Sequence, residues 1–247
     1  MKYDEYDRMT EAKFYERTQP TSTATLTNGY KETVTYDQRG NIQSLSRRSA
    51  YLASIQFNGP LKYYYGQIDN LTYNYPVGSN QLTNINDAAI GDEGYDDYPG
   101  NYTYDANGNT TTDPSRKVTI EYNHLDLPTK IKWTGSGQQR LEMTYDAAGT
   151  LLQRKKFSST NLLIETRDYI GGIEYKNSAL ESVAHAEGRV YFGGGSTERY
   201  DYALTDHLGN TRLLYSDLNN NGIPDVPSEI IQEEHYLPFG MKMTGPW

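Results

Sequence analysis

A chain of 247 residues is long enough for one all-β domain or for a run of repeats. The formal net charge of −9 and the scattered basic residues exclude nucleic acid as an expected partner, because phosphate binding needs clustered Lys and Arg. The absence of Cys excludes disulfides and thiolate chemistry, and no run approaches the roughly 18 apolar residues that span a bilayer.

The composition also indicates what kind of core to expect. The mean hydropathy is −0.81, which is low for a folded domain. The chain nevertheless contains 24 tyrosines, and Tyr can bury its ring while its hydroxyl keeps a hydrogen bond. We therefore expect a tyrosine-lined core rather than a disordered chain.

The first residues contain no apolar stretch typical of a signal peptide. If the parent protein is exported, we expect its signal outside this chain. Residues 3–17 are compatible with a short helix, but Tyr6-Asp7 followed by Lys13-Phe14-Tyr15 fits a β-repeat better. Weaker copies of that repeat are expected to begin at Tyr6-Asp7, Tyr122-Asn123 and Tyr200-Asp201.

A Tyr-Asp-x-x-Gly motif recurs along the chain. Asp starts a tight turn by accepting backbone N–H groups, and Gly supplies the positive φ that the turn requires. Tyr closes the preceding strand with its ring on the buried face. The clear copies are Tyr36-Asp37-x-x-Gly40, Tyr104-Asp105-x-x-Gly108 and Tyr145-Asp146-x-x-Gly149, and a fourth copy, Asp206-x-x-Gly209, has Thr205 in place of Tyr.

The segments between these turns alternate apolar and polar residues, as half-buried strands do. Val118–Tyr122 places Val, Ile and Tyr on one face, and residues 131–133 and 141–145 repeat the scheme. Residues 86–94 are predicted to be a surface loop. The pattern predicts an all-β fold of antiparallel β-hairpin repeats forming a curved, twisted strip, and the turns themselves are interpreted as structural.

On these residues the sequence resembles the bacterial RHS or YD-repeat family, whose animal relatives are the teneurins. Two C-terminal motifs are more specific: Asp206-His207-Leu208-Gly209-Asn210-Thr211-Arg212, followed by His235-Tyr236-Leu237-Pro238-Phe239-Gly240-Met241. This pair is similar to the opening of the RHS-associated core region in its Bacteroidetes version. Residues 1–199 are accordingly predicted to be the YD-repeat strip, and residues 200–247 the start of the core region.

The resemblance implies a role. Members of the family wind a β-strip into a hollow shell that encloses a C-terminal toxin or other cargo, which aspartates at an Asp-Pro-x-Gly type motif release by self-cleavage. The chain reaches Trp247 without that motif, and its one Asp-Pro pair, Asp113-Pro114, lies in mid-chain. We expect a non-enzymatic shell segment from a secreted or cell-surface parent, with the rest of the shell and the cargo as partners.

Residues 217–228 form a candidate calcium loop with oxygen ligands at the spacing of an EF-hand-type loop. Ser228 stands where a bidentate Glu is usual, and Glu229 follows it. The loop is similar to those of dockerins and thrombospondin type 3 repeats, and weak, roughly millimolar binding is predicted. The alternative is a polar turn without metal. The candidate ligands are Asp217, Asn219, Asn221, the Ile223 carbonyl and Asp225.

Other candidate sites are weaker. None of the four His residues has metal-ligand spacing, and no Gly-x-Ser-x-Gly nucleophile elbow occurs. No catalytic residue is therefore predicted. The alternative function is binding of a carbohydrate or cell-surface ligand through exposed aromatic rings at Tyr63-Tyr64-Tyr65 and Trp133, although core packing of these rings is the favoured interpretation.

Overall fold

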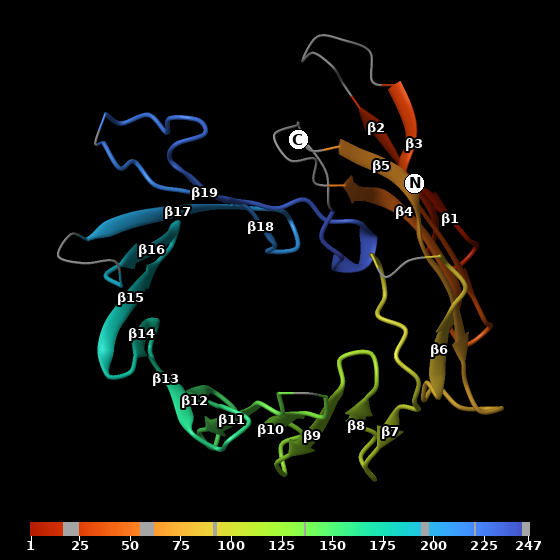
Figure 1. Ribbon diagram of the computed structural model, residues 1–247, viewed down its shortest axis with the longest axis horizontal. Coiled ribbons are helices and arrows are strands. Elements are labelled where there is room, and N and C mark those ends of the chain that lie inside the picture. Colours follow the sequence, from red (N-terminus) through yellow and green to blue (C-terminus); the bar gives the residue numbers. More distant parts are fainter. Residues whose placement is uncertain are drawn as a thin grey trace. The chain divides into compact units, whose positions relative to one another are not determined.

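Alternating apolar and polar residues form the strands of the protein. The structure is a computed structural model, and it describes residues 1–16, 25–54, 62–90, 93–135, 137–193, 198–219 and 221–243. These residues form antiparallel strands and one 3-10 turn, Pro238–Gly240, and none of them is in an α-helix. The strands make one sheet of 6 and one of 13 (Figure 1). The predicted fold class is therefore confirmed.

The six-stranded sheet follows chain order from β1 to β6. Residues 3–16, for which the sequence favours a β-repeat over a short helix, lie in the hairpin of β1 and β2, so that prediction is confirmed. Val34, Leu45 and Leu71 lie side by side on one face of the sheet, and each is at most 3% exposed. The strands are β1 (Lys2–Tyr3), β2 (Met9–Glu16), β3 (Thr25–Tyr36), β4 (Ile42–Ser54), β5 (Lys62–Asn74) and β6 (Asn84–Asp87).

The 13-stranded sheet also follows chain order, so each strand pairs with the next. In Figure 1 the strands coloured green to blue succeed one another along a curved sheet. They are β7 (Thr103–Tyr104), β8 (Thr110–Asp113), β9 (Val118–Tyr122), β10 (Pro128–Trp133), β11 (Arg140–Tyr145), β12 (Leu151–Phe157), β13 (Leu163–Ile170), β14 (Ile173–Lys176), β15 (Ala179–His185), β16 (Gly188–Tyr191), β17 (Arg199–Thr205), β18 (Thr211–Tyr215) and β19 (Ile230–Glu233).

The chain divides into two compact units. The first contains Met1–Thr103, Asp113–Arg116 and His235–Trp247, and the second contains Tyr104–Thr112 and Lys117–Glu234. The segment after β19 thus belongs with the N-terminal sheet, where Leu237 packs against Tyr30 and Ala50. The division predicted from sequence between residues 199 and 200 falls at the start of β17.

The predicted loop at residues 86–94 is only partly a surface excursion. Its first two residues end β6. At its far end Tyr95 donates its backbone N–H to the fully buried Asp69 carboxylate at 2.6 Å. A Cβ on Gly94 would lie 2.2 Å from Asp69 Oδ1, so the chain can approach β5 this closely only because residue 94 is Gly.

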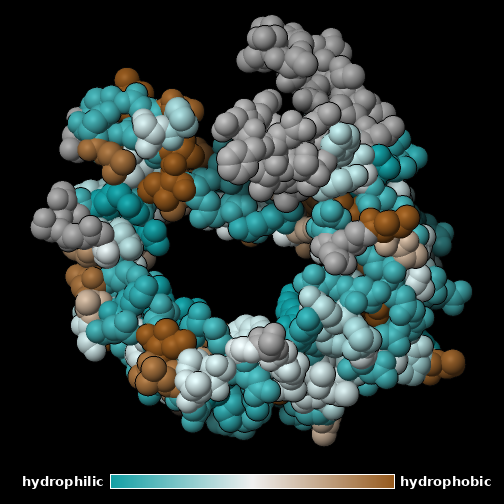
Figure 2. Space-filling model, in the orientation of Figure 1, coloured by the Kyte–Doolittle hydropathy of each residue, from teal (hydrophilic) through white to brown (hydrophobic). Residues whose placement is uncertain are grey.

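Apolar burial is sparse in the second unit, where Val118 is the one apolar residue among those described with a fully buried side chain. Most of the surface visible in Figure 2 is hydrophilic, with apolar residues in small patches. A sheet with so little apolar burial needs polar interactions between its strands to hold them in register.

Candidate functional site

The four Asp-x-x-Gly turns have one geometry. In each, the Asp carboxylate accepts the N–H groups two and four residues later, at 2.8–3.0 Å. The backbone N–H of the Asp donates to the carbonyl of the residue four positions later, and the Gly N–H donates to the Asp carbonyl. The φ angles of Gly40, Gly108, Gly149 and Gly209 lie between 84° and 90°, in the left-handed region that favours Gly.

These hydrogen bonds change the acidity of the turn carboxylates. The Asn109 side chain lowers the pKa of Asp105, and the Asn210 side chain does the same for Asp206. For Asp146 the largest cause of the lowered pKa is the backbone N–H of Thr150. The carboxylates are therefore held in their ionised, accepting form.

Tyrosine hydroxyls join consecutive turns. Tyr36 donates to the Met9 carbonyl at 2.9 Å, Tyr122 to the Thr110 carbonyl at 2.8 Å, and Tyr145 to the Pro128 carbonyl at 2.9 Å. In each case the acceptor is the first residue of the strand that leaves the preceding turn. We call this hydrogen bond the tyrosine clasp. Burial raises the pKa of all three hydroxyls, so they remain protonated donors.

Side chains of neighbouring turns also touch. Asn107 and Asn109 both donate to Asp126 Oδ1, at 2.9 and 2.7 Å, which links the turn after β7 to the turn after β9. In the first unit, Arg8 donates to the Asp37 carbonyl at 3.0 Å, and its guanidinium lies 4.7 Å from the Tyr36 ring centre. In each sheet these two neighbouring turns thus contact one another rather than standing as independent corners.

Two of the weaker sequence copies are placed differently by the structure. The first copy starts at Tyr3-Asp4, because Asp4 accepts the N–H groups of Tyr6 and Arg8. Asp7 takes the Gly position with φ 59°. Tyr200-Asp201 is not a turn at all: Asp201 lies within β17, fully buried between Arg189 and Arg199.

The copy expected at Tyr122-Asn123 is a turn of the repeat type. Asn123 accepts the N–H groups of Leu125 and Leu127, and Asp126 has φ 58° at the Gly position. The sequence analysis missed another such turn, in which Ser158 accepts the N–H groups of Thr160 and Leu162. This turn lacks Tyr, Asp and Gly. Its only sequence signal is a Ser followed three residues later by an Asn, and that Asn161 has φ 69°.

The candidate calcium loop is closed by its own side chains. The Asp217 carboxylate accepts the N–H groups of Asn221 and Gly222, at 3.1 and 2.8 Å. Asp225 Oδ2 accepts the side-chain amides of Asn219 and Asn221. The side chains of Asn219, Asn221 and Asp225 thus contact one another, whereas Asp217 accepts backbone N–H groups. The fifth predicted ligand residue, Ile223, donates its N–H to Asn221 Oδ1.

Glu229, rather than Ser228, anchors this loop. Glu229 is 3% exposed, and its carboxylate accepts the N–H groups of Leu218, Asn219 and Asp225, at 2.6, 3.0 and 2.9 Å. Among the described residues, no three His, Cys, Asp or Glu side chains are arranged to hold a metal. Calcium binding at this loop therefore stays a prediction.

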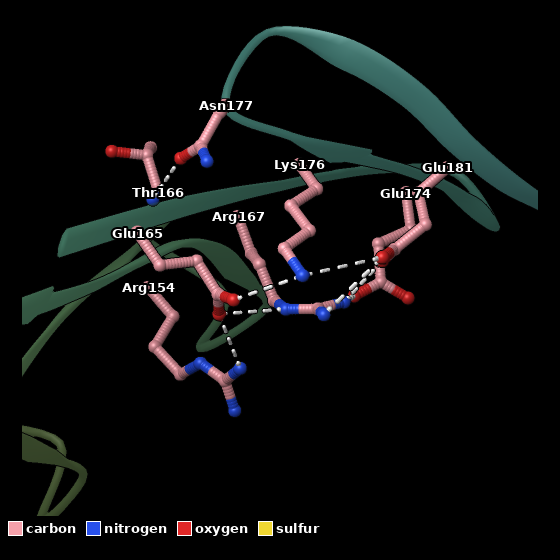
Figure 3. Close-up of polar contacts among 8 residues, drawn as sticks. All are labelled: Arg154, Glu165, Thr166, Arg167, Glu174, Lys176, Asn177 and Glu181. Atoms are coloured by element: carbon pink, nitrogen blue, oxygen red, sulfur yellow. Dashed lines mark hydrogen bonds and ion pairs between the residues drawn. The ribbon is translucent and has the colours of Figure 1, made fainter. Parts of the chain in front are cut away.

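An ion-pair network crosses β12 to β15 (Figure 3). Arg167 contacts Glu165 at 2.9 Å and also pairs with Glu174 and Glu181. Partial burial alone would lower the pKa of Arg167, but its hydrogen bonds to Glu174 and Glu165 raise it. With Arg154 and Lys176 the network has three cations and three carboxylates, so it balances its charge and fixes strand register.

The aromatic rings considered for ligand binding are partly exposed. Tyr64 and Tyr65 are each 45% exposed and Trp133 is 37% exposed. Tyr64 stacks on Tyr51 and Tyr65 packs edge-on against Tyr30, so both also contribute to packing. The side chain of Tyr63 lies outside the described residues.

These features define an antiparallel hairpin-repeat protein in which many corners are turns capped by the side chain of their first residue, most often Asp. No family model matches the chain, and no curated protein does. No membrane-spanning helix is found in the described part of the chain.

Solved structures provide the similarities. One is a Tc holotoxin pore of Photorhabdus luminescens carrying a TccC3 mutation, with 18% identity, a TM-score of 0.49, and coverage of 98% of this chain and 14% of that one. A TcdB2–TccC3 complex matches with 16% identity, a TM-score of 0.48, and coverage of 98% and 15%. The complex with Cdc42 matches with 17% identity, a TM-score of 0.49, and the same coverage of 98% and 15%.

At these identities the likeness concerns the fold alone. The chain spans about one seventh of the length of these three solved chains.

Proposed function

We propose that this chain is a structural segment of a β-repeat shell that encloses a C-terminal toxin or other cargo in its parent protein. The observation that carries the proposal is the tyrosine clasp, which recurs at Tyr36, Tyr122 and Tyr145 and each time joins one turn to the strand that leaves the preceding turn. Under this proposal the chain is not an enzyme, its partners are the rest of the shell and the cargo, and the parent is secreted or at the cell surface.

The chemistry of the turns supports a wall rather than a reaction centre. A catalytic acid or base needs a pKa near the working pH. The turn aspartates have lowered pKa values, and their carboxylate oxygens accept hydrogen bonds from backbone N–H groups. Arg167 is likewise fixed in its charged form by its carboxylate partners. These groups are suited to holding strands together.

Protease protection in the parent protein tests the proposal. The region C-terminal to the shell should resist digestion in the wild type and become sensitive in Gly188→Val. A Cβ at Gly188 would lie 2.0 Å from the Asp201 carbonyl oxygen, so this variant separates β16 from β17. Ala147→Ser, in an exposed turn position, is the matched control. Equal digestion of all three proteins would contradict an enclosing wall.

Self-cleavage is tested by intact mass. The isolated chain should remain a 28.1 kDa species after prolonged incubation. Appearance of two fragments whose masses sum to that value would show that the segment is catalytic.

Calcium binding at residues 217–229 is a second proposal, based on the gathering of the Asn219 and Asn221 side chains at the Asp225 carboxylate in a loop that Asp217 closes through backbone N–H groups. Calcium would replace the side-chain amide contacts to Asp225, and Glu229 would keep the loop closed. Calorimetric titration of the wild type and of Asp217→Asn should show heat in the wild type alone, at roughly millimolar calcium. No heat from the wild type would refute the site.

Carbohydrate binding is the alternative function, and the partly exposed rings of Tyr64, Tyr65 and Trp133 are the observation that favours it. Aromatic faces of this kind can stack on sugar rings. A glycan array should then give hits that Trp133→Ala or Tyr64→Ala abolishes. An array without hits would remove this alternative.

A further inference from the structure

A half-open cavity of ≈ 160 Å³ lies within the first unit, between β2–β3 and the segment that follows β19. That segment folds back on itself, since Leu237 donates to the Met241 carbonyl and Met243 to the His235 carbonyl. The cavity is lined chiefly by aromatic, aliphatic and Met side chains, among them Phe14, Tyr30, Tyr236, Leu237 and Met243.

One carboxylate borders this apolar cavity. Glu32 is 0% exposed, and neither of its carboxylate oxygens has a hydrogen-bond partner within the described part of the chain. Leaving a buried polar group without a partner is costly, and for an ionised carboxylate the cost is far larger. A bound ligand that pairs with the Glu32 carboxylate would offset this cost.

In the described part of the chain, the cation that strand register places beside Glu32 is already paired with another carboxylate. Strand register places Glu32 beside Arg47, and Arg47 beside Asp69. Arg47 Nε lies 2.6 Å from Asp69 Oδ2, so the one guanidinium in this row is committed to the other carboxylate. Lys13 also borders the cavity, but its ammonium pairs with Glu11 at 3.4 Å.

We propose that this cavity binds a small alkylammonium group, with the Glu32 carboxylate as its counter-ion and the rings of Phe14, Tyr30 and Tyr236 around its alkyl part. A cation among aromatic rings gains from their quadrupoles as well as from the carboxylate. The volume is close to that of an engineered cavity of about 150 Å³ that accepts benzene, so it suits a ligand of a few heavy atoms.

The chemistry disfavours other ligands. An anion would meet the Glu32 carboxylate, and a divalent metal would find one carboxylate where it prefers several oxygen ligands. An uncharged apolar ligand would leave the carboxylate unpartnered. The ammonium could belong to a free amine or to the tip of a Lys side chain, which present the same group.

Calorimetric titration of the full chain with n-propylammonium, at roughly pH 8 so that Glu32 is ionised, tests the proposal. A ligand of this size should bind with a Kd of about 1 mM. Glu32→Gln should weaken binding about tenfold or more, whereas Glu5→Gln, which removes the same charge at an exposed turn, should leave it unchanged. Titration with n-propanol should give no binding.

The outcomes separate clearly. No binding of propylammonium to the wild type, equal binding to Glu32→Gln, or equal binding of propanol would each overturn the proposal. Should Glu32→Gln not fold, Phe14→Leu gives an independent reading, since loss of a ring should weaken binding of propylammonium. A parallel titration with Nα-acetyl-lysinamide distinguishes the sources: tighter binding than propylammonium indicates a Lys tip, and weaker binding indicates a free amine.

Discussion

Glu32→Gln is expected to make the stability of the chain less dependent on pH. Burial raises the pKa of Glu32 to about 7, from its ordinary value of 4.5; Arg47 opposes this rise and Asp69 adds to it. In the folded chain without ligand the side chain therefore holds a proton up to near neutral pH. In the unfolded chain it loses that proton near its ordinary pKa.

The sign follows from proton binding. Between pH 4.5 and about 7 the folded chain binds more protons at Glu32 than the unfolded chain does, so stability falls as pH rises through this window. Each pKa unit corresponds to about 1.4 kcal/mol, so the difference amounts to about 3 kcal/mol when the window has been crossed. Gln cannot ionise, and it removes this loss while keeping the shape of the side chain.

Urea denaturation of the first unit at intervals from pH 5 to pH 8 measures the effect. The wild type should lose about 3 kcal/mol of unfolding free energy across this range relative to Glu32→Gln. Glu5→Gln, at an exposed position, should follow the wild type. If the unfolding free energies of the wild type and Glu32→Gln change with pH in parallel, the pKa of Glu32 is not raised by burial, which contradicts this prediction.

Two further effects are expected in the second unit. Gly149→Ala should destabilise it by about 1–2 kcal/mol in urea denaturation, because Gly149 has φ 89°, whereas Gly149→Asn should cost less; equal costs would contradict the backbone explanation. The pKa values of Asp105 and Asp206 are lowered in the folded chain, so the stability that these carboxylates contribute above their ordinary pKa is lost as the pH falls below that pKa. Asp105→Asn should therefore make unfolding in acid, followed by circular dichroism, less dependent on pH. An unchanged acid profile would show that this carboxylate does not stabilise its turn.

The sequence predicted the strands and the corners for a physical reason. Turn geometry is encoded locally, since an Asp and a Gly three residues apart supply the acceptor and the positive φ that the turn needs. Alternation of apolar and polar residues is likewise local, and it placed Val118–Tyr122 correctly as a strand.

Non-local features escaped prediction. The tyrosine clasp joins residues 12 to 27 positions apart, and nothing in a Tyr-Asp pair states which carbonyl its hydroxyl will reach. Asp201 resembled a turn residue because the sequence does not show that Arg189 lies on the adjacent strand. The cavity beside Glu32 depends on the segment after β19 packing against β3, and no local sequence pattern predicts that contact.

Removing the hydroxyls of two clasps tests the central claim most directly. Tyr122→Phe and Tyr145→Phe each delete one partly buried hydrogen bond to a backbone carbonyl and should each cost about 1 kcal/mol, or about 2 kcal/mol together because the two acceptors are different residues. Tyr200→Phe, at a ring that is 51% exposed, is the control and should cost little. If urea denaturation gives the double variant the same unfolding free energy as the wild type, the turns are not held together by tyrosine hydroxyls.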